Sequence, residues 1–304
     1  MRNNKNTKNL NGWISIDKPV GISSAKAVAE VKKILNPKKI GHAGTLDPLA
    51  CGVLPLALGE ATKTINYMMD ADKIYEFTVN WGEEKTTDDA EGEVVKSSDI
   101  RPKKSDITEL LPRFTGNIRQ TPPDYSAIKI NGKRACDLLR NGQDIELKER
   151  IVNIYHIDIQ EHNNKSTRFI CECGKGTYIR SIARDIGRII GCYGYVSYLC
   201  RISVGKFDKN NAISLEKLGD MVHKGSVDFL RPVESALDDI LAWDVNSTQA
   251  EFLRNGQSIS VPSFMGREVS ADGNTILFAR NDGVPVAICK YEAGVMKPVR
   301  VFNL

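Results

Sequence analysis

Apolar and polar positions follow two spacings along this chain, and they predict a mixture of strands and helices. Residues alternate from Lys73 to Trp81, which is typical of a strand that buries Tyr75, Phe77 and Val79 on one face. Shorter patterns predict further strands at 14–19, 151–159 and 168–173, and a buried apolar run at 53–58. Helical spacing predicts helices at 61–69, at 181–190, and from Ser23 or Ser24 to about 35, where Asn36-Pro37 ends the helix.

The pattern changes near Trp243-Asp244, where short expected strands alternate with turn dipeptides. These dipeptides are Asn255-Gly256, Asp272-Gly273 and Asp282-Gly283. We therefore place a domain boundary at about 240–247 and expect a small β-rich module after it. At the other end, residues 1–11 are polar and basic without the apolar segment of a secretory signal, so we expect a flexible tail. No run of about 18 apolar residues predicts a transmembrane helix.

Composition excludes a wholly disordered or fibrous chain, because 41% of the 304 residues are hydrophobic and 26% are charged. The net charge of +4 is a cancellation between segments of opposite sign. Residues 101–150 hold eleven basic residues against seven acids, and residues 165–206 hold eight against two. Residues 70–99 hold ten acids against three lysines, which we interpret as a solvated acidic face, and residues 208–304 hold thirteen acids against ten basic residues. The basic segments favour a polyanionic partner.

The seven cysteines do not indicate a disulfide framework or a zinc site. Their number is odd, and the only close pair is Cys171-x-Cys173, which should face one side of a strand. No second pair of cysteines or histidines completes a set of zinc ligands. We expect reduced thiols in a cytoplasmic protein, with no metal bound.

Three common catalytic motifs are also missing from the sequence. Gly174-Lys175-Gly176-Thr177 is not a phosphate-binding P-loop, because glycine rather than serine or threonine follows the lysine. No H-x-E and P-C-x-x-C pair indicates a zinc deaminase, and no G-x-S-x-G indicates a serine hydrolase.

Asp47 is the strongest candidate for a reactive residue. It lies in a segment, residues 38–52, whose three glycines and Pro48 make it too irregular for an internal helix or strand. A carboxylate fixed on such a loop is able to act as a nucleophile or a base. It needs a cationic partner to stay ionised in a closed site, and Arg180 in the basic segment is suitable. The alternative is that Asp47 caps a turn and Arg180 lies on the surface.

The loop also carries a family resemblance. It reads Gly41-His42-Ala43-Gly44-Thr45-Leu46-Asp47-Pro48, followed by Ala50-x-Gly52-Val53-Leu54-Pro55, and resembles the catalytic motif of the TruB-type pseudouridine synthases. Further segments resemble other motifs of this family, in family order and spacing: Trp13-x-x-x-Asp17-Lys18-Pro19-x-Gly21-x-x-Ser24, Lys73-x-Tyr75, Pro122-Pro123-x-Tyr125-Ser126-Ala127-x-Lys129, Gly132-x-Arg134, Gly176-Thr177-Tyr178-Ile179-Arg180-Ser181-x-Ala183-Arg184-Asp185-x-Gly187, Leu199-x-Arg201 and Gly205-x-Phe207.

The resemblance implies an isomerase that converts the T-loop uridine at position 55 of tRNA to pseudouridine without a cofactor. Asp47 would be the catalytic aspartate, with its role as sugar adduct, base adduct or proton acceptor left open. Arg180 would hold it through a bidentate guanidinium. A base inside a folded loop must be flipped out, and His42 would take its place in the stack. Tyr75 would stack on the flipped base, its alternative being core packing.

Other residues acquire expected roles in the same way. Tyr178, two residues before Arg180 on an extended segment, would line the base pocket with Leu199. Lys18 would face the pocket or a phosphate, or else lie on the surface. An insertion at about 101–150 would grip RNA phosphates through Lys129, Lys133 and Arg134, with binding that weakens in salt.

The fold class that the resemblance implies is α+β, the pseudouridine synthase fold with a mixed, largely antiparallel central sheet. The catalytic domain would span residues 12–243, and residues 244–304 would form a PUA-like module whose acidic balance leaves a purely structural role open. We expect a cytoplasmic monomer that binds the T-arm of tRNA, without a membrane or an obligate protein partner. Two alternatives are a non-catalytic tRNA-binding or tRNA-folding protein and a guide-RNA-dependent pseudouridine synthase.

Overall fold

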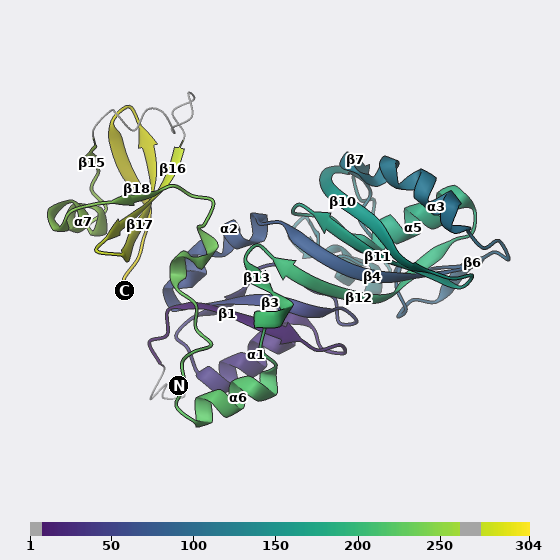
Figure 1. The fold of residues 1–304 in the computed structure, drawn as a ribbon, viewed down its shortest axis with the longest axis horizontal. Coiled ribbons are helices and arrows are strands. Elements are labelled where there is room, and N and C mark those ends of the chain that lie inside the picture. Colours follow the sequence, from purple (N-terminus) through teal and green to yellow (C-terminus); the bar gives the residue numbers. More distant parts are fainter. Residues whose placement is uncertain (1–7, 262–274) are drawn as a thin grey trace.

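A computed structural model describes residues 8–261 and 275–304 of the 304-residue chain. Figure 1 shows a large body of sheet and helices, with a smaller β-rich body formed by the C-terminal segment. The expected turn at Asp272-Gly273 and residues 1–7 of the expected tail lie outside the described residues. The described part of that tail is not free, because the Lys8 amide donates to the Asn36 carbonyl at 3.0 Å and the Asn11 side chain accepts from the Glu60 amide at 2.9 Å.

The large body is built on one nine-stranded sheet. Its main path runs in the order β1 (Gly12–Lys18), β3 (Cys51–Leu58), β12 (Gly194–Val204), β4 (Lys73–Trp81), β11 (Ser166–Cys173), β10 (Arg150–His162) and β7 (Gly116–Gln120). Two short strands join it at the side, with β2 (Ile40–His42) pairing with β3 and β13 (Phe207–Asp208) pairing with β12. Among the strand pairings described in this sheet, only β3 with β12 is parallel. The expected mixed, largely antiparallel sheet is therefore confirmed.

Helices and short hairpins connect these strands. The helices are α1 (Ser24–Leu35), α2 (Ile65–Asp70), α3 (Lys104–Leu110), α4 (Ala135–Arg140), α5 (Ile179–Ile190) and α6 (Leu215–His223). The 3₁₀ segments are η1 (Gly59–Thr64), η2 (Leu111–Phe114), η3 (Lys209–Asn211) and η4 (Val233–Ala236). Two separate hairpins are β5 (Glu83–Lys85) with β6 (Val94–Ser97), and β8 (Lys129–Ile130) with β9 (Lys133–Arg134).

Within the described residues, the C-terminal body has its own five-stranded sheet. Its order is β14 (Ala242–Asp244), β16 (Thr275–Asn281), β17 (Val284–Glu292), β18 (Val295–Val301) and β15 (Ile259–Ser260), accompanied by α7 (Ser247–Arg254). A hydrophobic cluster joins the two bodies, since Trp13 and Phe207 of the large body and Phe278 and Phe302 of the small one belong to it. The β-rich C-terminal region thus shares a core with the large body.

Most of the expected elements are present, with boundaries set by their caps. The Ser23 side chain accepts from the Lys26 amide and begins α1, and Asn36 ends it in the left-handed conformation with φ 46°. Strand β4 alternates between buried and half-buried residues along its whole length, as its pattern predicts. The expected helix at 61–69 is instead divided between η1 and α2.

Two expectations about local structure are wrong. Residues Ile40–His42 of the irregular segment form β2, because pairing with Leu56–Leu58 of β3 supplies the hydrogen bonds that the local sequence does not predict. Helix α5 begins at Ile179 rather than at 181, so Arg180 lies within the helix. Tyr178 is its N-cap residue and does not belong to a strand.

The acidic stretch between residues 70 and 99 is not simply a solvated face. Glu84, Asp88 and Asp89 are only 5–7% exposed. Each pairs with an arginine of α5: Glu84 with Arg188 at 2.7 Å, Asp88 with Arg184 at 3.1 Å, and Asp89 with Arg180 at 3.6 Å. These arginines are spaced four residues apart and so share one face of the helix. The three acids are buried, as are Arg180 and Arg184, while Arg188 is 48% exposed, and these opposite charges pair across about 100 residues of sequence.

The parallel junction between β3 and β12 requires a glycine. Gly52 is paired with Arg201, has φ 98°, and a Cβ atom there would lie 2.2 Å from the Arg201 carbonyl oxygen. Both the backbone conformation and the close approach exclude a side chain. Gly52 therefore allows the start of β3, which directly follows the loop that contains Asp47, to pack closely against β12.

We predict that Gly52→Ala lowers the free energy of unfolding by roughly 2–5 kcal/mol, because it adds backbone strain to a steric clash. Gly219 in α6 is the matched control, since a Cβ atom there meets nothing within 4 Å. Gly219→Ala should stabilise the protein by about 0.5–1 kcal/mol through its higher helix propensity. Urea denaturation of both variants measures the difference, and a Gly52→Ala protein as stable as the wild type would contradict this account of the junction.

Candidate active site

A cavity of about 580 Å³ opens between the loop that contains Asp47 and the start of α5. Its lining comes from six separate parts of the chain: residues 44–47, residues of α2 and β4, residues 127–128, residues 150–151, residues 174–180, and Leu199 and Arg201 of β12. Asp47, Tyr75, Tyr178, Arg180 and Leu199 all contribute to it. The structure therefore brings together five of the residues that the sequence proposed for the pocket.

Asp47 is presented by a loop whose backbone is fixed on both sides. The Ser24 hydroxyl accepts from the Leu46 amide at 2.8 Å and is 2.9 Å from the Leu46 carbonyl. The Ala43 amide donates to the Pro55 carbonyl at 2.9 Å, and the Ala50 amide to the Asp47 carbonyl at 3.1 Å. The Asp47 side chain remains 38% exposed. A rigid loop thus holds an accessible carboxylate at the cavity wall.

Arg180 makes the expected ion pair with Asp47. Its Nη2 atom lies 3.0 Å from Asp47 Oδ2, and its side chain is only 5% exposed. The same guanidinium donates through Nη1 to the Thr87 carbonyl at 2.7 Å and through Nη2 to the Tyr125 carbonyl at 3.0 Å. The bidentate arrangement that we expected is replaced by one close contact, since backbone carbonyls take the guanidinium's hydrogen bonds. Arg180 is therefore immobilised independently of Asp47.

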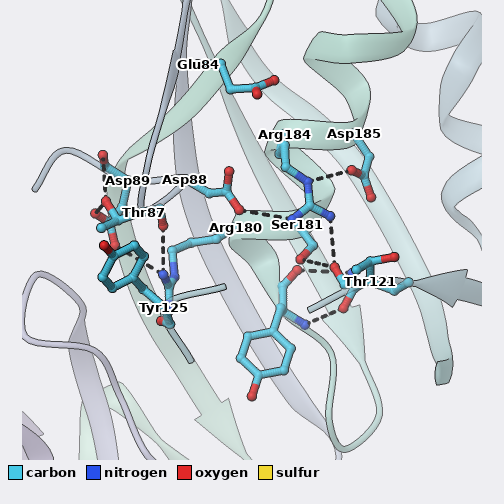
Figure 2. A network of polar contacts seen from close by, with 12 residues as sticks. Glu84, Thr87, Asp88, Asp89, Thr121, Tyr125, Arg180, Ser181, Arg184 and Asp185 are labelled. Atoms are coloured by element: carbon cyan, nitrogen blue, oxygen red, sulfur yellow. Dashed lines mark hydrogen bonds and ion pairs between the residues drawn. The ribbon is translucent and has the colours of Figure 1, made fainter. Parts of the chain in front are cut away.

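A second arginine extends this network along α5 (Figure 2). Arg184 donates to Asp88 at 3.1 Å, to Asp185 at 2.8 Å and to the Thr121 carbonyl at 2.8 Å. The Ser181 hydroxyl donates to the same Thr121 carbonyl at 2.8 Å. Burial raises the pKa of Asp88 to about 6, and the Arg184 charge opposes that effect. The network joins α5 to the 87–89 turn and to the beginning of the 121–127 segment.

Tyr75 and Tyr178 supply aromatic surface to the cavity. Tyr75 projects from β4, and burial raises the pKa of its hydroxyl, which is hydrogen-bonded to Arg201. The backbone of Tyr178 is held by the Gln120 side chain, which accepts from its amide at 2.8 Å and donates to its carbonyl at 3.1 Å. Burial also raises the pKa of Tyr178. Both hydroxyls are therefore neutral at pH 7, and the rings offer flat surfaces for an aromatic ligand.

Lys18 and His42 do not line this cavity. Lys18 is completely buried, and its ammonium donates to the carbonyls of Pro19 at 2.9 Å, Ile22 at 2.7 Å and Pro48 at 3.4 Å. The expectation that Lys18 faces the pocket, a phosphate or the surface is wrong, because these carbonyls enclose it behind the Asp47 loop. His42 lies on β2, and its Nδ1 atom is buried without a hydrogen-bond partner. Burial lowers the pKa of His42, so its ring is neutral at pH 7.

Lys129, Lys133 and Arg134 lie on the β8–β9 hairpin, and all three are exposed. The neighbouring residues Ala127 and Ile128 line the cavity. A basic, exposed hairpin therefore adjoins the cavity mouth.

Two buried cations near the cavity received no role from the sequence. Arg201 is 1% exposed, and it donates through Nε to the Val53 carbonyl at 2.8 Å and through Nη2 to the Gly44 carbonyl at 3.0 Å. Lys73 donates to the Met69 carbonyl at 2.5 Å, and burial lowers the pKa of Lys73 to about 8. The sequence offered one signal for a buried cation, which is the basic residue within the otherwise apolar strand at Leu199-x-Arg201.

Within residues 8–261 and 275–304, no group of three or more His, Cys, Asp or Glu side chains is placed to hold a metal ion. Across the same residues, no helix combines the length and apolar character needed to cross a membrane.

The chain matches sequence models of two family domains. Residues 32–179 match the TruB family pseudouridylate synthase N-terminal domain, and residues 180–238 match the tRNA pseudouridylate synthase B C-terminal domain. Proteins named tRNA pseudouridine synthase B are similar over almost the whole chain. One from Ehrlichia chaffeensis is 48% identical and is covered to 99%, with 96% of this chain. One from Nitrobacter winogradskyi is 46% identical and is covered to 85%, with 99% of this chain.

Solved structures share the fold. A Cbf5–Nop10–Gar1 complex contains a chain that is 26% identical with a TM-score of 0.74, covering 96% of this chain and 85% of the other. An H/ACA ribonucleoprotein bound to a substrate RNA contains one that is 22% identical with a TM-score of 0.73 and the same coverage. The expected pseudouridine synthase fold with a β-rich C-terminal region is thereby confirmed.

We predict that Arg201→Met loosens the Asp47 loop, because the Gly44 and Val53 carbonyls lose their buried charged donor. A loss of stability of about 3–5 kcal/mol is expected for an interaction of this kind. Hydrogen-exchange mass spectrometry should show faster exchange in residues 43–50 than in the wild type. Arg168→Met is the matched control, since Arg168 pairs with Glu161 on the exposed side of the same sheet and should change stability by less than about 1 kcal/mol. Equal exchange of the loop in both variants would refute the role of Arg201.

Proposed function

This chain belongs to the TruB family of pseudouridylate synthases, and on that premise we propose that it isomerises the uridine at position 55, in the T-loop of tRNA. Isomerisation of a tRNA uridine is the activity that the family and its named relatives support. The position in the tRNA and the roles of individual residues are the specific parts of the proposal. The observation that carries it is the 3.0 Å ion pair of Asp47 with a buried Arg180 at the wall of an aromatic-lined cavity.

The reaction breaks the N-glycosidic bond of uridine, turns the base and joins it to the ribose through carbon. Asp47 is the residue that we assign to this chemistry. The other carboxylate in the cavity lining, Asp70, is paired with Lys175 at 2.9 Å on the exposed rim. A carboxylate adds to the sugar, adds to the base or accepts a proton only when it is ionised and aimed at the reacting centre. Arg180 supplies the aim, because its own position is set by the Thr87 and Tyr125 carbonyls.

The base must leave the T-loop stack before it reaches Asp47. Tyr75 then stacks on the flipped uracil, a contact worth about 1–3 kcal/mol, while Tyr178 and Leu199 complete the pocket. His42 takes the vacated place in the RNA, for which a neutral ring on a short strand next to the catalytic loop is suitable. Lys18 contributes from behind by holding the Pro48 carbonyl, so it positions Asp47 without touching substrate.

RNA affinity comes from the basic hairpin. Lys129, Lys133 and Arg134 project from the insertion at about 101–150 and have no ion-pair partner among the described residues. Exposed cations of this kind neutralise phosphates and release counterions. They hold the T-arm so that the loop presents its uridine to the cavity.

We assign residues 12–243 as the catalytic domain and 244–304 as a PUA-like module, which is supported by their separate sheets. The protein is proposed to act in the cytoplasm as a monomer, without a guide RNA, an obligate protein partner or a cofactor. The relatives that carry the name tRNA pseudouridine synthase B over nearly this whole length support a stand-alone enzyme.

We predict that purified protein converts one uridine of an unmodified tRNA transcript, at position 55, and that Asp47→Asn abolishes conversion. The substitution removes the ionised carboxylate but conserves side-chain volume, so tRNA binding should change less than about threefold. Pseudouridine mapping at single-nucleotide resolution measures product, and filter binding measures affinity.

Each alternative gives a different result in this assay. Conversion by the Asp47→Asn protein would refute the catalytic assignment, and product elsewhere in the tRNA would refute the position. Failure of the wild type on bare transcript would favour a guide-dependent enzyme. An Asp47→Asn protein that restores full tRNA function in cells would favour a role in tRNA folding.

We predict that replacing Lys129, Lys133 and Arg134 together by alanine lowers tRNA affinity and reduces the slope of log affinity against log salt by about 2–3, roughly one for each lost phosphate contact. The maximal rate on saturating tRNA should change little, because none of the three side chains lines the cavity. A charge-matched control replaces three exposed residues elsewhere in the insertion. These are Lys103 and Lys104 at the beginning of α3 and Arg113 in η2. If this control reduces the slope equally, the hairpin has no special role in binding.

A further inference from the structure

Two cysteines lie opposite each other where the loop that contains Asp47 ends and β3 begins. Cys51 is the first residue of β3, and Cys200 is its direct partner on β12 in the parallel pairing. Paired residues on neighbouring strands project to the same face, and the strands lie about 4.8 Å apart. That separation falls within the range of about 4.4–6.8 Å between Cα atoms that disulfides span. The two thiols are close enough for each to shift the pKa of the other.

The surroundings of the pair favour one thiolate. Lys209 places its ammonium 3.3 Å from Cys200 Sγ, and the Cys51 thiol is 3.9 Å from the Tyr198 hydroxyl. The hydrogen bond from Cys51 lowers the pKa of Cys200 to about 6, and the Lys209 ammonium acts in the same direction while burial opposes it. The same hydrogen bond raises the pKa of Cys51. At neutral pH the pair therefore holds one shared proton, and the thiolate form reacts with disulfides.

Exposure separates this pair from the other cysteines. Of the seven thiols, only those of Cys51 and Cys136 belong to partly exposed residues. Cys136 contacts the Asp137 carboxylate at 3.8 Å rather than a second thiol. Cys171 and Cys173 do hydrogen-bond to each other, but both are completely buried. Cys51 and Cys200 thus combine a reachable sulfur with a partner sulfur.

The pair lies where a change of geometry reaches the active site. Cys51 follows Asp47 by four residues, and Cys200 follows Leu199 directly. Asp47, Ala50, Tyr198 and Leu199 line one small hollow beside the main cavity. Closing the two sulfurs to the disulfide bond length of about 2.0 Å fixes both side-chain conformations and locks β3 to β12 at this point. The backbones are already close at the next pair, because a Cβ atom on Gly52 would lie 2.2 Å from the Arg201 carbonyl oxygen.

We propose that Cys51 and Cys200 are a redox-sensitive dithiol that closes reversibly to a disulfide and lowers isomerase activity while closed. The oxidant is a low-molecular-weight disulfide. After the shared proton moves to Cys200, the Cys51 thiolate attacks one sulfur of the small disulfide and releases one small thiol. The Cys200 sulfur then loses its proton, displaces the second small thiol and forms the Cys51–Cys200 bond. The two cysteine sulfurs lose two electrons and their one shared proton. The small disulfide gains the two electrons, and its two released thiolates take up that proton and a second one from solvent.

The test uses the full-length reduced protein in buffers of increasing glutathione disulfide to glutathione ratio. Alkylation and peptide mass spectrometry should find a linked Cys51–Cys200 peptide whose amount rises with the ratio. Activity on a tRNA transcript should fall at least fivefold in parallel and return fully with dithiothreitol. Because the activity readout rests on the proposed function, the peptide is measured independently: an inactive reduced protein would contradict that function, while the peptide would still decide the disulfide.

Three variants complete the experiment. Cys51→Ser and Cys200→Ser should keep the activity of the reduced wild type within about twofold and lose the response to glutathione disulfide. Cys136→Ser, the other partly exposed cysteine, should respond like the wild type. The proposal is overturned if no linked peptide forms, if the fully linked protein retains full activity, or if Cys136→Ser abolishes the response.

Discussion

The buried guanidinium of Arg180 is the interaction on which the site depends. Its side chain is 5% exposed, so its charge must be neutralised inside the protein. The groups that surround it come from three distant segments, with Asp47 before β3, Thr87 and Asp89 after β5, and Tyr125 in the insertion. A single charge therefore connects the Asp47 loop, the 87–89 turn and the segment that contains Tyr125.

The carboxylates that pair with α5 are buried, as is Arg184, whereas Arg188 is 48% exposed. Arg184 and Arg188 continue the face of α5 that Arg180 begins, and they require the carboxylates of Asp88 and Glu84. Arg201 plays the corresponding part beneath the loop, where the carbonyls of Gly44 and Val53 accept from it. The Asp47 loop, at the edge of the hydrophobic core, is thereby held by two fixed cations, Arg180 and Arg201. Cys51 and Cys200 lie beside this loop, so a disulfide between them would change the position of Asp47.

Local patterns predicted the secondary structure well and the burial of charge poorly. Strand β4 and helix α1 follow directly from alternation and from the Ser23 cap, because these signals lie within a few residues of the element that they define. The prediction that the acidic stretch is a solvated face was wrong, because its arginine partners lie about 100 residues further along the chain. The prediction for Lys18 was wrong for a similar reason, since one of the carbonyls that enclose it belongs to Pro48, 30 residues away. Composition records that a charge exists, but not which distant group neutralises it.

The sequence by itself determined the family, the mixed fold class and the identity of the residues around the cavity, because motifs with this spacing recur only where backbone and chemistry are both constrained. Only the tertiary structure decided how those residues are held. It showed that Arg180 contacts Asp47 through one nitrogen, that Lys18 supports the loop from behind, and that Cys51 meets Cys200. Each of these facts depends on the register between strands or on packing between segments far apart in the chain, and no local pattern encodes such a distance.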